Sequence, residues 1–183
     1  MLTRFFALIF LIILLPIFLL LAVVIFFEDG FPIFFKQKRI GINYTFFQIY
    51  KFRSMKKNTP NVATHQLDNP NQYLLKIGKI IRKTSLDELP NLFNIIKGEM
   101  CFVGPRPALY SQVDLMELRV LAGVDKLKPG ITGWAQINGR DEINIETKVN
   151  FEKEYLLKKT FILDSKIILK TLFKVILIKD INH

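Results

Sequence analysis

The sequence is poor in the residues that covalent cross-links and thiolate metal sites need, because it holds a single cysteine, Cys101. One cysteine excludes an intramolecular disulfide and any cysteine-rich metal site, and it fits a protein that works in a reducing compartment. A lone cysteine is most often a small buried apolar residue, and we expect Cys101 to be one. The chain also lacks internal repeats and low-complexity segments, so its 183 residues fit one domain of ordinary size.

Acidic side chains are scarce relative to basic ones. The chain has 16 Asp and Glu residues against 26 Lys and Arg residues, which gives a formal charge of +10. Such a charge indicates an anionic partner: nucleic acid, an anionic membrane surface or a phosphorylated substrate. A nucleic-acid-binding protein would concentrate its basic residues in one patch. Here the lysines are spread over loops and the C-terminal part of the chain, so we expect no nucleic-acid partner.

Residues 5–27 contain no charged side chain, which leaves an apolar run of 23 residues between Arg4 and Glu28. As a helix this run measures roughly 34 Å, against about 30 Å for the hydrocarbon core of a bilayer. It is too long for the apolar part of a signal peptide, and no small-residue cleavage site follows it. A buried core helix would need apolar neighbours on all sides, which the lysine-rich remainder does not supply. We therefore expect residues 1–28 to insert into a membrane.

Pro16 lies in the middle of this run, where it removes a backbone hydrogen bond and pushes against the preceding turn. Two outcomes stay open: a kinked helix that crosses the bilayer, or a helix that bends back so that both ends leave on one face. Hydropathy alone favours the first outcome. Lys36, Lys38 and Arg39 follow the run closely, and the positive-inside rule places them on the cytoplasmic side with the rest of the basic chain.

The rest of the chain alternates between strand-like and helix-like stretches. Aromatic-rich segments on both sides of a turn-like stretch predict a β-hairpin over residues 31–55. Residues 58–71 are polar and carry two prolines, which predicts a loop. Helices are expected over residues 74–83, 111–120 and 160–179. The last of these is apolar with lysines four residues apart, which fits either a helix in a membrane interface or a packed C-terminal core helix.

Two further segments carry cations that a ligand could use. Lys51 and Arg53 stand two residues apart in the predicted hairpin, so a strand would present both on one face. They are either solvated charges of an edge strand or cations for a substrate. Residues 128–140 are punctuated by glycines, contain the single tryptophan, Trp134, and end at Arg140. Glycines let a ligand approach the backbone and an aromatic ring can stack on a base, although ordinary turn chemistry is the commoner explanation.

The most informative stretch is residues 87–107. It begins with two adjacent carboxylates, Asp87 and Glu88, and ends with Arg106 held between two prolines. Carboxylates can act as nucleophile, base or metal ligand, and a rigidly held arginine can bind phosphate or carboxylate in a bidentate manner. A structural alternative exists, because Ser85 and Glu88 have the spacing of a helix capping box. Pro90 argues against it, since proline is tolerated only at a helix start, and we expect the carboxylates on the approach to a helix.

Five segments appear in the order in which bacterial sugar transferases carry them: the apolar N-terminal run, Lys51-Phe52-Arg53-Ser54-Met55, Asp87-Glu88-Leu89-Pro90, Val103-Gly104-Pro105-Arg106-Pro107 and residues 128–140. On these motifs the chain resembles the small monotopic phosphoglycosyl transferases, whose best-known type is the bacillosamine-phosphate transferase of bacterial N-glycosylation. The resemblance covers residues 1–175. It implies an α+β, helix-rich fold with a re-entrant membrane helix in residues 1–28, and a β-hairpin and an interfacial catalytic domain in residues 29–183.

The resemblance also implies a reaction, in which a sugar 1-phosphate passes from a UDP-sugar to undecaprenyl phosphate and UMP leaves. The route runs through a covalent phosphosugar intermediate and requires Mg²⁺. Asp87 would be the nucleophile and a ligand of Mg²⁺, and Glu88 would assist it in proton transfer or positioning. The residues that would bind the nucleotide sugar are Lys51, Arg53, Arg106 and Arg140. These substrates place the protein at the cytoplasmic face of the bacterial inner membrane.

Two positions depart from the family pattern. Leu15 stands where a serine usually precedes the membrane proline, and Cys101 stands where a serine is common. A serine hydroxyl can satisfy a carbonyl freed by proline, so we expect a less sharp break at Pro16. A catalytically silent scaffold of a glycan-assembly complex and a nucleotide-sugar hydrolase are the alternative functions. Closeness to the small members favours an N-acetylated UDP-hexose, while the residues themselves identify neither the sugar nor the final glycan nor the oligomeric state.

Overall fold

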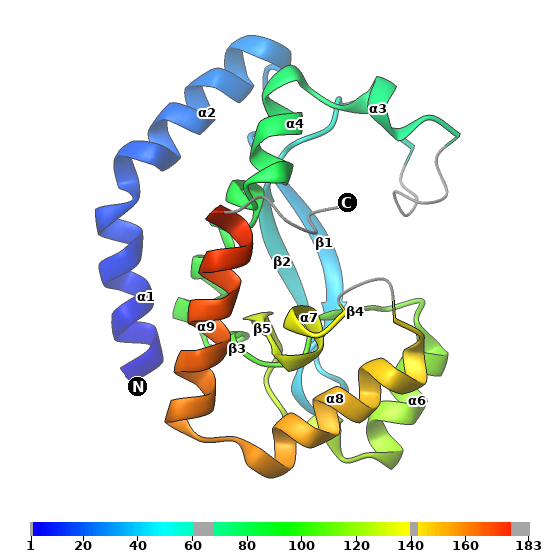
Figure 1. The fold of residues 1–183 in the computed structure, drawn as a ribbon. Helices are drawn as coiled ribbons and strands as arrows, with labels where there is room; N and C mark the ends of the chain where they lie inside the picture. Colours follow the sequence, from blue (N-terminus) through cyan, green and yellow to red (C-terminus); the bar gives the residue numbers. More distant parts are fainter. Residues whose placement is uncertain (1, 61–67, 140–142, 177–183) are drawn as a thin grey trace.

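The computed structural model describes residues 2–60, 68–139 and 143–176, and it mixes helices and strands with the helices dominating. Figure 1 shows a long pair of N-terminal helices along one side of a β-hairpin, with a group of C-terminal helices packed around a smaller sheet. This agrees with the α+β, helix-rich fold class expected from the sequence. The division of the chain at residue 28 into a membrane part and a catalytic domain stays a prediction.

The apolar N-terminal run forms two helices, α1 (Leu2–Ile13) and α2 (Leu15–Asp29), which meet at an angle of 60°. The break lies at Leu14, two residues ahead of the proline expected to cause it, and Pro16 sits in the first turn of α2. Proline is tolerated there because the first N–H groups of a helix have no intrahelical acceptor, whereas its ring would press on the carbonyl of the preceding turn if α1 continued. Pro16 therefore ends α1 rather than kinking a continuous helix.

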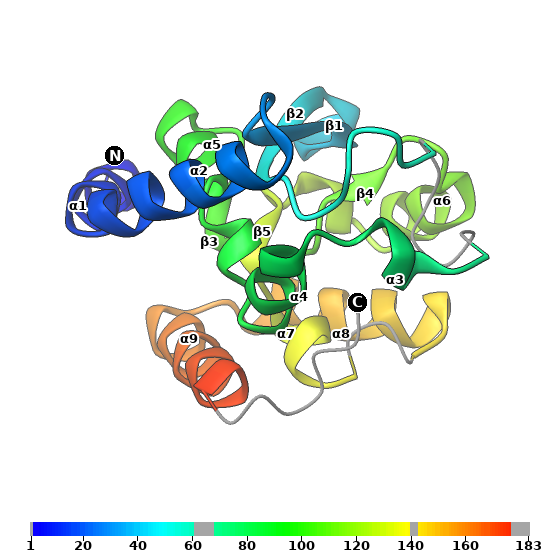
Figure 2. The same cartoon turned by 90° about the horizontal axis from the view of Figure 1, so that it is seen from above.

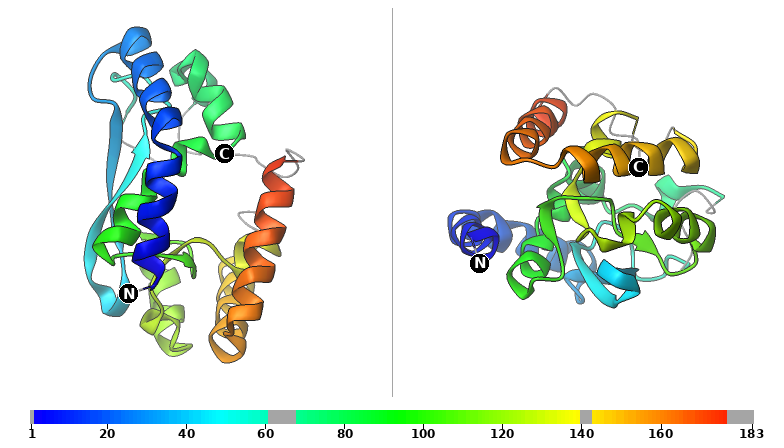
Figure 3. Two further views of the ribbon diagram at one scale, coloured as in Figure 1. Left: turned by 90° about the vertical axis from the view of Figure 1, so that its left-hand side faces the viewer. Right: turned by 90° about the horizontal axis from the view of Figure 1, so that it is seen from below.

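The outer face of this helix pair is apolar and exposed. Only Ala7 of α1 is buried, while α2 packs Phe18, Leu21 and Ile25 against the body of the protein. Phe27 leaves 82% of its surface exposed, and Figure 3 shows both helices running along one side of the molecule. None of the described helices is long and apolar enough to cross a bilayer alone, but α1 and α2 reach that length and composition together. Spanning and re-entrant arrangements both stay predictions.

The predicted hairpin is confirmed. Strands β1 (Phe34–Ile40) and β2 (Phe46–Phe52) pair antiparallel, and β4 (Ala108–Leu109) adds to the free edge of β1. A second, parallel sheet joins β3 (Cys101–Val103) to β5 (Gly130–Thr132). Cys101 is half-buried in β3 rather than fully buried as expected, and burial raises the pKa of its thiol to about 11, which disfavours the reactive thiolate.

A helical segment links the two sheets. The helix expected over residues 74–83 is confirmed as α4 (Lys76–Lys83), and the short α3 (Pro70–Tyr73) precedes it where a loop was expected. After α4 the chain makes one 3-10 turn, η3 (Leu86–Glu88), and then forms α5 (Asn91–Lys97). Glu28 at the end of α2 accepts hydrogen bonds from the first two backbone N–H groups of α4, which ties the N-terminal helices to this segment.

The C-terminal half is built from α6 (Val113–Leu121), the 3-10 turn η4 (Val124–Lys126), α7 (Trp134–Ile137), α8 (Ile145–Lys158) and α9 (Phe161–Ile176). Figure 2 shows α8 and α9 on the side of the β3–β5 sheet that faces away from the hairpin. The helix expected at residues 111–120 is confirmed as α6, and the helix expected at residues 160–179 is confirmed as α9 up to Ile176, since residues 177–179 lie outside the described part of the chain. Helix α8 was not predicted, because its buried face contains the charged Glu152 between Val149 and Tyr155 and so lacks a continuous apolar pattern.

Candidate active site

The two adjacent carboxylates lie in η3, between α4 and α5. Ser85, just before the turn, adopts a left-handed conformation with φ of 56° and makes no capping hydrogen bond through its side chain. Helix α5 starts only after Pro90. The capping-box alternative is therefore wrong, and the prediction that Asp87 and Glu88 lie on the approach to a helix is confirmed.

Lys51 of β2 contacts both carboxylates. Its Nζ lies 2.7 Å from Glu88 Oε1 and 3.9 Å from Asp87 Oδ2. Arg106 Nη1 lies 3.4 Å from the same Glu88 oxygen. The structure thus brings together four of the residues that the sequence singled out, from three segments that are far apart in the chain. Glu88 contacts both Lys51 and Arg106 and so holds their charged groups in position.

A cleft opens beside this cluster. It is lined by the polar residues Arg39, Lys51, Glu88, Asn91 and Arg106 and by the apolar residues Ile49, Met100 and Ile131, among others. Asn91 Oδ1 is buried and has no hydrogen-bond partner within the described part of the chain. Three cations face one carboxylate along the lining, so the cleft suits an anionic ligand.

Asp87 is buried, with 4% of its surface exposed. Burial raises the pKa of its carboxyl from 3.8 to about 6; the charge of Lys51 opposes the rise and that of Glu88 adds to it. Arg82 of α4 and Arg106 also favour the ionised form. At pH 7 this carboxylate is ionised, yet it is more basic than an ordinary aspartate, which suits a nucleophile or a general base.

The chemistry of Asp87 fits the expected Mg²⁺. The described residues hold no group of three or more His, Cys, Asp or Glu side chains that could enclose a metal ion. Mg²⁺ needs no such group, because it keeps several waters and binds proteins through one or two carboxylates. Asp87 Oδ1 is buried without a hydrogen-bond partner among those residues, so an oxygen of the required kind is available to a cation. The magnesium requirement itself stays a prediction.

Arg106 stands on a bend whose backbone is held by two other arginines. Arg39 Nη1 donates to the carbonyl of Pro107 at 3.0 Å, and Arg119 Nη2 donates to the carbonyl of Arg106 at 3.0 Å. Arg119 is buried in α6 and pairs with Glu152 of α8, with 2.7 Å between Nε and Oε2. Sequence reasoning did not assign Arg39, Arg82 or Arg119 to the site, because their positions become neighbours of the motif residues only in the folded chain.

The glycine-punctuated segment at residues 128–140 supports the same bend. Gly104 N–H donates to Thr132 O at 2.8 Å, and Gly130 N–H donates to Pro105 O at 2.9 Å. A Cβ on Gly104 would lie 2.3 Å from the carbonyl oxygen of Lys128, so only glycine allows this approach. Both glycines therefore serve backbone packing, and for Gly130 this agrees with the structural explanation given for residues 128–140.

Arg53 and Arg140 do not join the cluster in the described structure. The Arg53 guanidinium is buried, and it donates to the carboxylate of Asp29 and to the backbone carbonyls of Asp29, Gly30 and Pro32. It therefore ties β2 to the end of α2, while its expected role in substrate binding stays a prediction. Arg140 lies outside the described residues.

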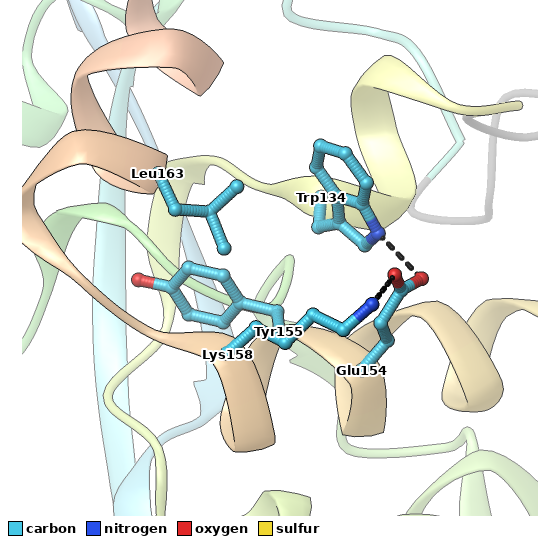
Figure 4. Close-up of a pocket in the computed structure, with 5 residues that line it drawn as sticks. All are labelled: Trp134, Glu154, Tyr155, Lys158 and Leu163. Atoms are coloured by element: carbon cyan, nitrogen blue, oxygen red, sulfur yellow. Dashed lines mark hydrogen bonds and ion pairs between the residues drawn. The ribbon is translucent and has the colours of Figure 1, made fainter.

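Trp134 lines a different pocket, formed by α7, α8 and α9 (Figure 4). Its indole N–H donates to Glu154 Oε2 at 2.9 Å, and Lys158 pairs with the other oxygen of that carboxylate. The remaining walls are Tyr155 and Leu163. The Tyr155 hydroxyl donates outside this group, to Asp164 Oδ1 at 2.7 Å, and none of the lining residues belongs to the carboxylate cluster. The structure thus gives the indole N–H a partner within the protein, and stacking of Trp134 on a base stays a prediction.

Comparison with known proteins adds independent information. The sequence matches the model of the family described as bacterial sugar transferase over residues 1–178. It is 46% identical over 112 residues to the "Uncharacterized sugar transferase EpsL" of Bacillus subtilis, which covers 61% of this chain and 54% of that protein.

Two further relatives carry names that state a substrate. A UDP-N-acetylgalactosamine-undecaprenyl-phosphate N-acetylgalactosaminephosphotransferase of Aeromonas hydrophila is 38% identical over 124 residues, which cover 67% of this chain and 29% of the relative. A UDP-glucose:undecaprenyl-phosphate glucose-1-phosphate transferase of Escherichia coli is 41% identical over 112 residues, which cover 59% of this chain and 24% of the relative. The matches thus span about half or less of the length of these relatives. The narrower resemblance to bacillosamine-phosphate transferases stays a prediction.

Proposed function

The chain belongs to the bacterial sugar transferase family, and on this premise we propose that it moves a sugar 1-phosphate from a UDP-sugar to undecaprenyl phosphate with release of UMP. The observation that carries the proposal is the buried carboxylate of Asp87 near Lys51, next to a cleft that Lys51, Glu88 and Arg106 line together. A basic, partly neutralised carboxylate next to cations is what direct attack on a diphosphate requires.

In the first step, a carboxylate oxygen of Asp87 attacks the phosphorus that carries the sugar. A new Asp87–phosphorus bond forms while the bond from that phosphorus to the bridging oxygen breaks, and UMP leaves with the bond's electron pair. Lys51 and Arg106 neutralise the diphosphate charge, which would otherwise repel the attacking carboxylate. The enzyme then holds the sugar phosphate as an acyl phosphate on Asp87.

In the second step, a phosphate oxygen of undecaprenyl phosphate attacks the same phosphorus, and Asp87 leaves as a carboxylate. Splitting the transfer in two means that the small cleft never has to hold the nucleotide and the lipid head group together. Asp87 would hold Mg²⁺, and the ion would supply additional positive charge beside the diphosphate. Glu88 acts through the two cations that it bridges, Lys51 and Arg106, by keeping them at the reacting phosphate.

In this proposal the membrane segments bring the active site to the bilayer that contains the lipid acceptor. The exposed apolar face of α1 and α2 would enter the bilayer at the cytoplasmic face of the bacterial inner membrane. Helix α9 would lie in the interface, since Phe161, Ile162 and Phe173 are largely exposed and Lys166 and Lys170 accompany them. A monotopic arrangement would put the carboxylate cluster within reach of a lipid head group.

The sugar is proposed to be an N-acetylated hexose. The names of the two relatives that state a sugar support a UDP-hexose donor, one with N-acetylgalactosamine and one with glucose. A panel of UDP-sugars compared by UMP release tests this part of the proposal, and a preference for UDP-glucose over every N-acetylated donor would refute it.

The decisive experiment uses purified full-length protein in detergent with Mg²⁺ and a UDP-sugar, first without the lipid acceptor. We expect UMP release to stop near one equivalent per enzyme, and intact-protein mass spectrometry to show one sugar phosphate added. Peptide mapping should place it on Asp87, and Asp87→Asn should give neither UMP nor the adduct. Undecaprenyl phosphate should then discharge the adduct and restore continuous turnover.

Each alternative function predicts a different result. A scaffold without activity would release no UMP under any condition. A nucleotide-sugar hydrolase would release UMP continuously without undecaprenyl phosphate. Full activity of Asp87→Asn would exclude Asp87 as the nucleophile while leaving the overall reaction standing.

A further inference from the structure

Arg39 is a cleft residue without a place in the reaction described above. It lies on β1, paired with Phe47 of β2 on one side and with Leu109 of β4 on the other. Because neighbouring side chains of a strand alternate between faces, Arg39 lies on the face opposite Lys38. Its side chain lines the same cleft as Lys51, Glu88 and Arg106.

The guanidinium of Arg39 is only partly used by the protein. Nη1 donates to Pro107 O at 3.0 Å, and Nη2 donates to Gln37 Oε1 at 2.6 Å. Nε is buried and has no partner within the residues that the structure describes. A guanidinium has five N–H donors, so three of them remain for another acceptor. A buried donor without an acceptor is costly, which favours a ligand that supplies one.

The charges around Arg39 point to the sign of that ligand. None of the ion pairs of the described residues includes Arg39. The pKa of its guanidinium is lowered to about 10, chiefly by burial and then by the neighbouring charge of Arg106, while the charge of Glu88 opposes the change. Two arginines that repel one another across a cleft are both stabilised when an anion binds between them.

We propose that Arg39 and Arg106 together bind a phosphoryl group in the cleft, with Arg39 contributing the donors that its contacts to Pro107 and Gln37 leave unused. This inference rests on the proposed function for the identity of the anion, but anion binding itself does not depend on turnover. The same chemistry could serve the diphosphate of the nucleotide sugar or the head group of undecaprenyl phosphate. Arg39 also donates a hydrogen bond to the carbonyl of Pro107, so it helps to orient Arg106 while both arginines bind the same phosphoryl group.

The first test measures anion binding without catalysis. Sodium pyrophosphate and sodium phosphate are titrated into detergent-solubilised wild type, Arg39→Gln, Arg39→Lys and Lys38→Gln, and thermal unfolding is followed. Lys38→Gln is the matched control, because it removes the same charge from the opposite face of the same strand, where Lys38 lies over the ring of Phe46. We expect the stabilisation by pyrophosphate to be lost in Arg39→Gln, reduced in Arg39→Lys and unchanged in Lys38→Gln.

The second test measures kinetics and identifies the source of the anion. We expect Arg39→Gln to raise one KM by roughly 10- to 100-fold, the loss typical of a charge-assisted hydrogen bond, with a smaller change in kcat. A rise in the KM for the UDP-sugar identifies the diphosphate, and a rise in the KM for undecaprenyl phosphate identifies the head group. Arg39→Lys keeps the charge and serves as the folded reference if Arg39→Gln is unstable.

The outcomes separate this inference from the proposed function. Unchanged pyrophosphate stabilisation in both Arg39 variants, with both KM values at wild-type level, would overturn the role of Arg39 even in an active transferase. A wild type without UMP release but with Arg39-dependent pyrophosphate stabilisation would overturn the proposed reaction and keep the anion site. A fall in kcat alone would assign Arg39 to holding the bend and would overturn phosphoryl binding.

Discussion

Lys51 Nζ lies 2.7 Å from Glu88 Oε1, although the two residues are 37 positions apart in the sequence. The contact joins the hairpin to the turn that carries the two adjacent carboxylates. The same ammonium group lies 3.9 Å from Asp87 Oδ2, and its charge lowers the pKa of Asp87 against the effect of burial. One residue of β2 therefore controls both the position of Glu88 and the protonation of Asp87.

This relationship predicts the pH profile of the enzyme. Activity of the wild type should fall as the pH drops through about 6, because a protonated Asp87 cannot attack phosphorus. In Lys51→Met the acidic limb of the kcat/KM profile should move to higher pH by roughly one unit, because the ionised form of Asp87 loses its nearest cation. Initial rates of UMP release from pH 4.5 to 9 measure this shift.

Two controls accompany the pH measurement. Lys51→Arg retains the positive charge and should keep the limb near its wild-type position. Lys36→Met removes a lysine of the same hairpin that lies over the ring of Tyr50 and should leave the profile unchanged. An unshifted limb in Lys51→Met would show that another group sets the acidic side of the profile.

Asp87 should also cost the protein stability, and the sign follows from its pKa. The folded value of about 6 lies above the ordinary 3.8, so ionisation is less favourable in the folded state than in the unfolded chain. The destabilisation caused by ionised Asp87 is absent below pH 4. It develops as the pH rises from 4 to 6 and reaches its full value above pH 6. In EDTA at pH 7.5, Asp87→Asn should therefore raise the free energy of unfolding by about 1–3 kcal/mol.

Chemical denaturation in detergent across this pH range measures the difference between Asp87→Asn and wild type. The gap should close at pH 4, and adding Mg²⁺ should stabilise the wild type more than the variant. Asp125→Asn in η4, away from the cluster, is the matched control and should show no such gap. A variant that matches wild type at pH 4 but is less stable than wild type at pH 7.5 would mean that the ionised carboxylate stabilises the fold.

The sequence predicted the parts of the site that depend on local pattern. Aromatic-rich segments on both sides of a turn located the hairpin, and Pro90 correctly argued against a helix capped at Ser85. The convergence of Asp87, Glu88, Lys51 and Arg106 followed from family motifs rather than from any one spacing. The chain could not reveal Arg39 and Arg119 as holders of the Arg106 bend, because hydrogen bonds to backbone carbonyls leave no signature in side-chain order.

Pro16 correctly predicted a break in the apolar run, whereas helix α8 was not predicted. The break in the apolar run lies at Leu14 because proline disturbs the turn before it, not its own position. Helix α8 was not predicted because the buried Glu152 interrupts its apolar face. The ion pair with Arg119 of α6 offsets the free-energy cost of burying that carboxylate. In both places a neighbour in space or along the chain, rather than the residue itself, decided the structure.

Arg53 tests whether a motif cation binds substrate or holds the fold. Its buried guanidinium joins β2 to Asp29, the last residue of α2, so Arg53→Met should lower the free energy of unfolding by about 2–4 kcal/mol. The KM for the UDP-sugar should stay within a factor of about two, since no cleft contact is lost. Denaturation and steady-state kinetics on the same preparation measure both quantities.

Asp29→Asn is the partner variant, because it weakens the same contact from the other side and should lower stability in the same direction. The combined variant should be less destabilised than the sum of the two, as expected for residues in contact. A large rise in KM with unchanged stability in Arg53→Met would instead confirm the substrate-binding role predicted from the sequence.

Variants of the buried pair Arg119 and Glu152 distinguish two roles of Arg119, which are to stabilise the fold and to hold the bend that carries Arg106. Arg119→Met leaves Glu152 buried without its partner, so the free energy of unfolding should fall by about 3–5 kcal/mol. Arg119→Met/Glu152→Leu removes both charges and should regain most of that loss. The Arg106 carbonyl still lacks its donor in the double variant, so the KM for the UDP-sugar should stay several-fold above wild type while stability recovers. Wild-type KM in the stable double variant would show that the prolines on either side of Arg106 are enough to hold it in place.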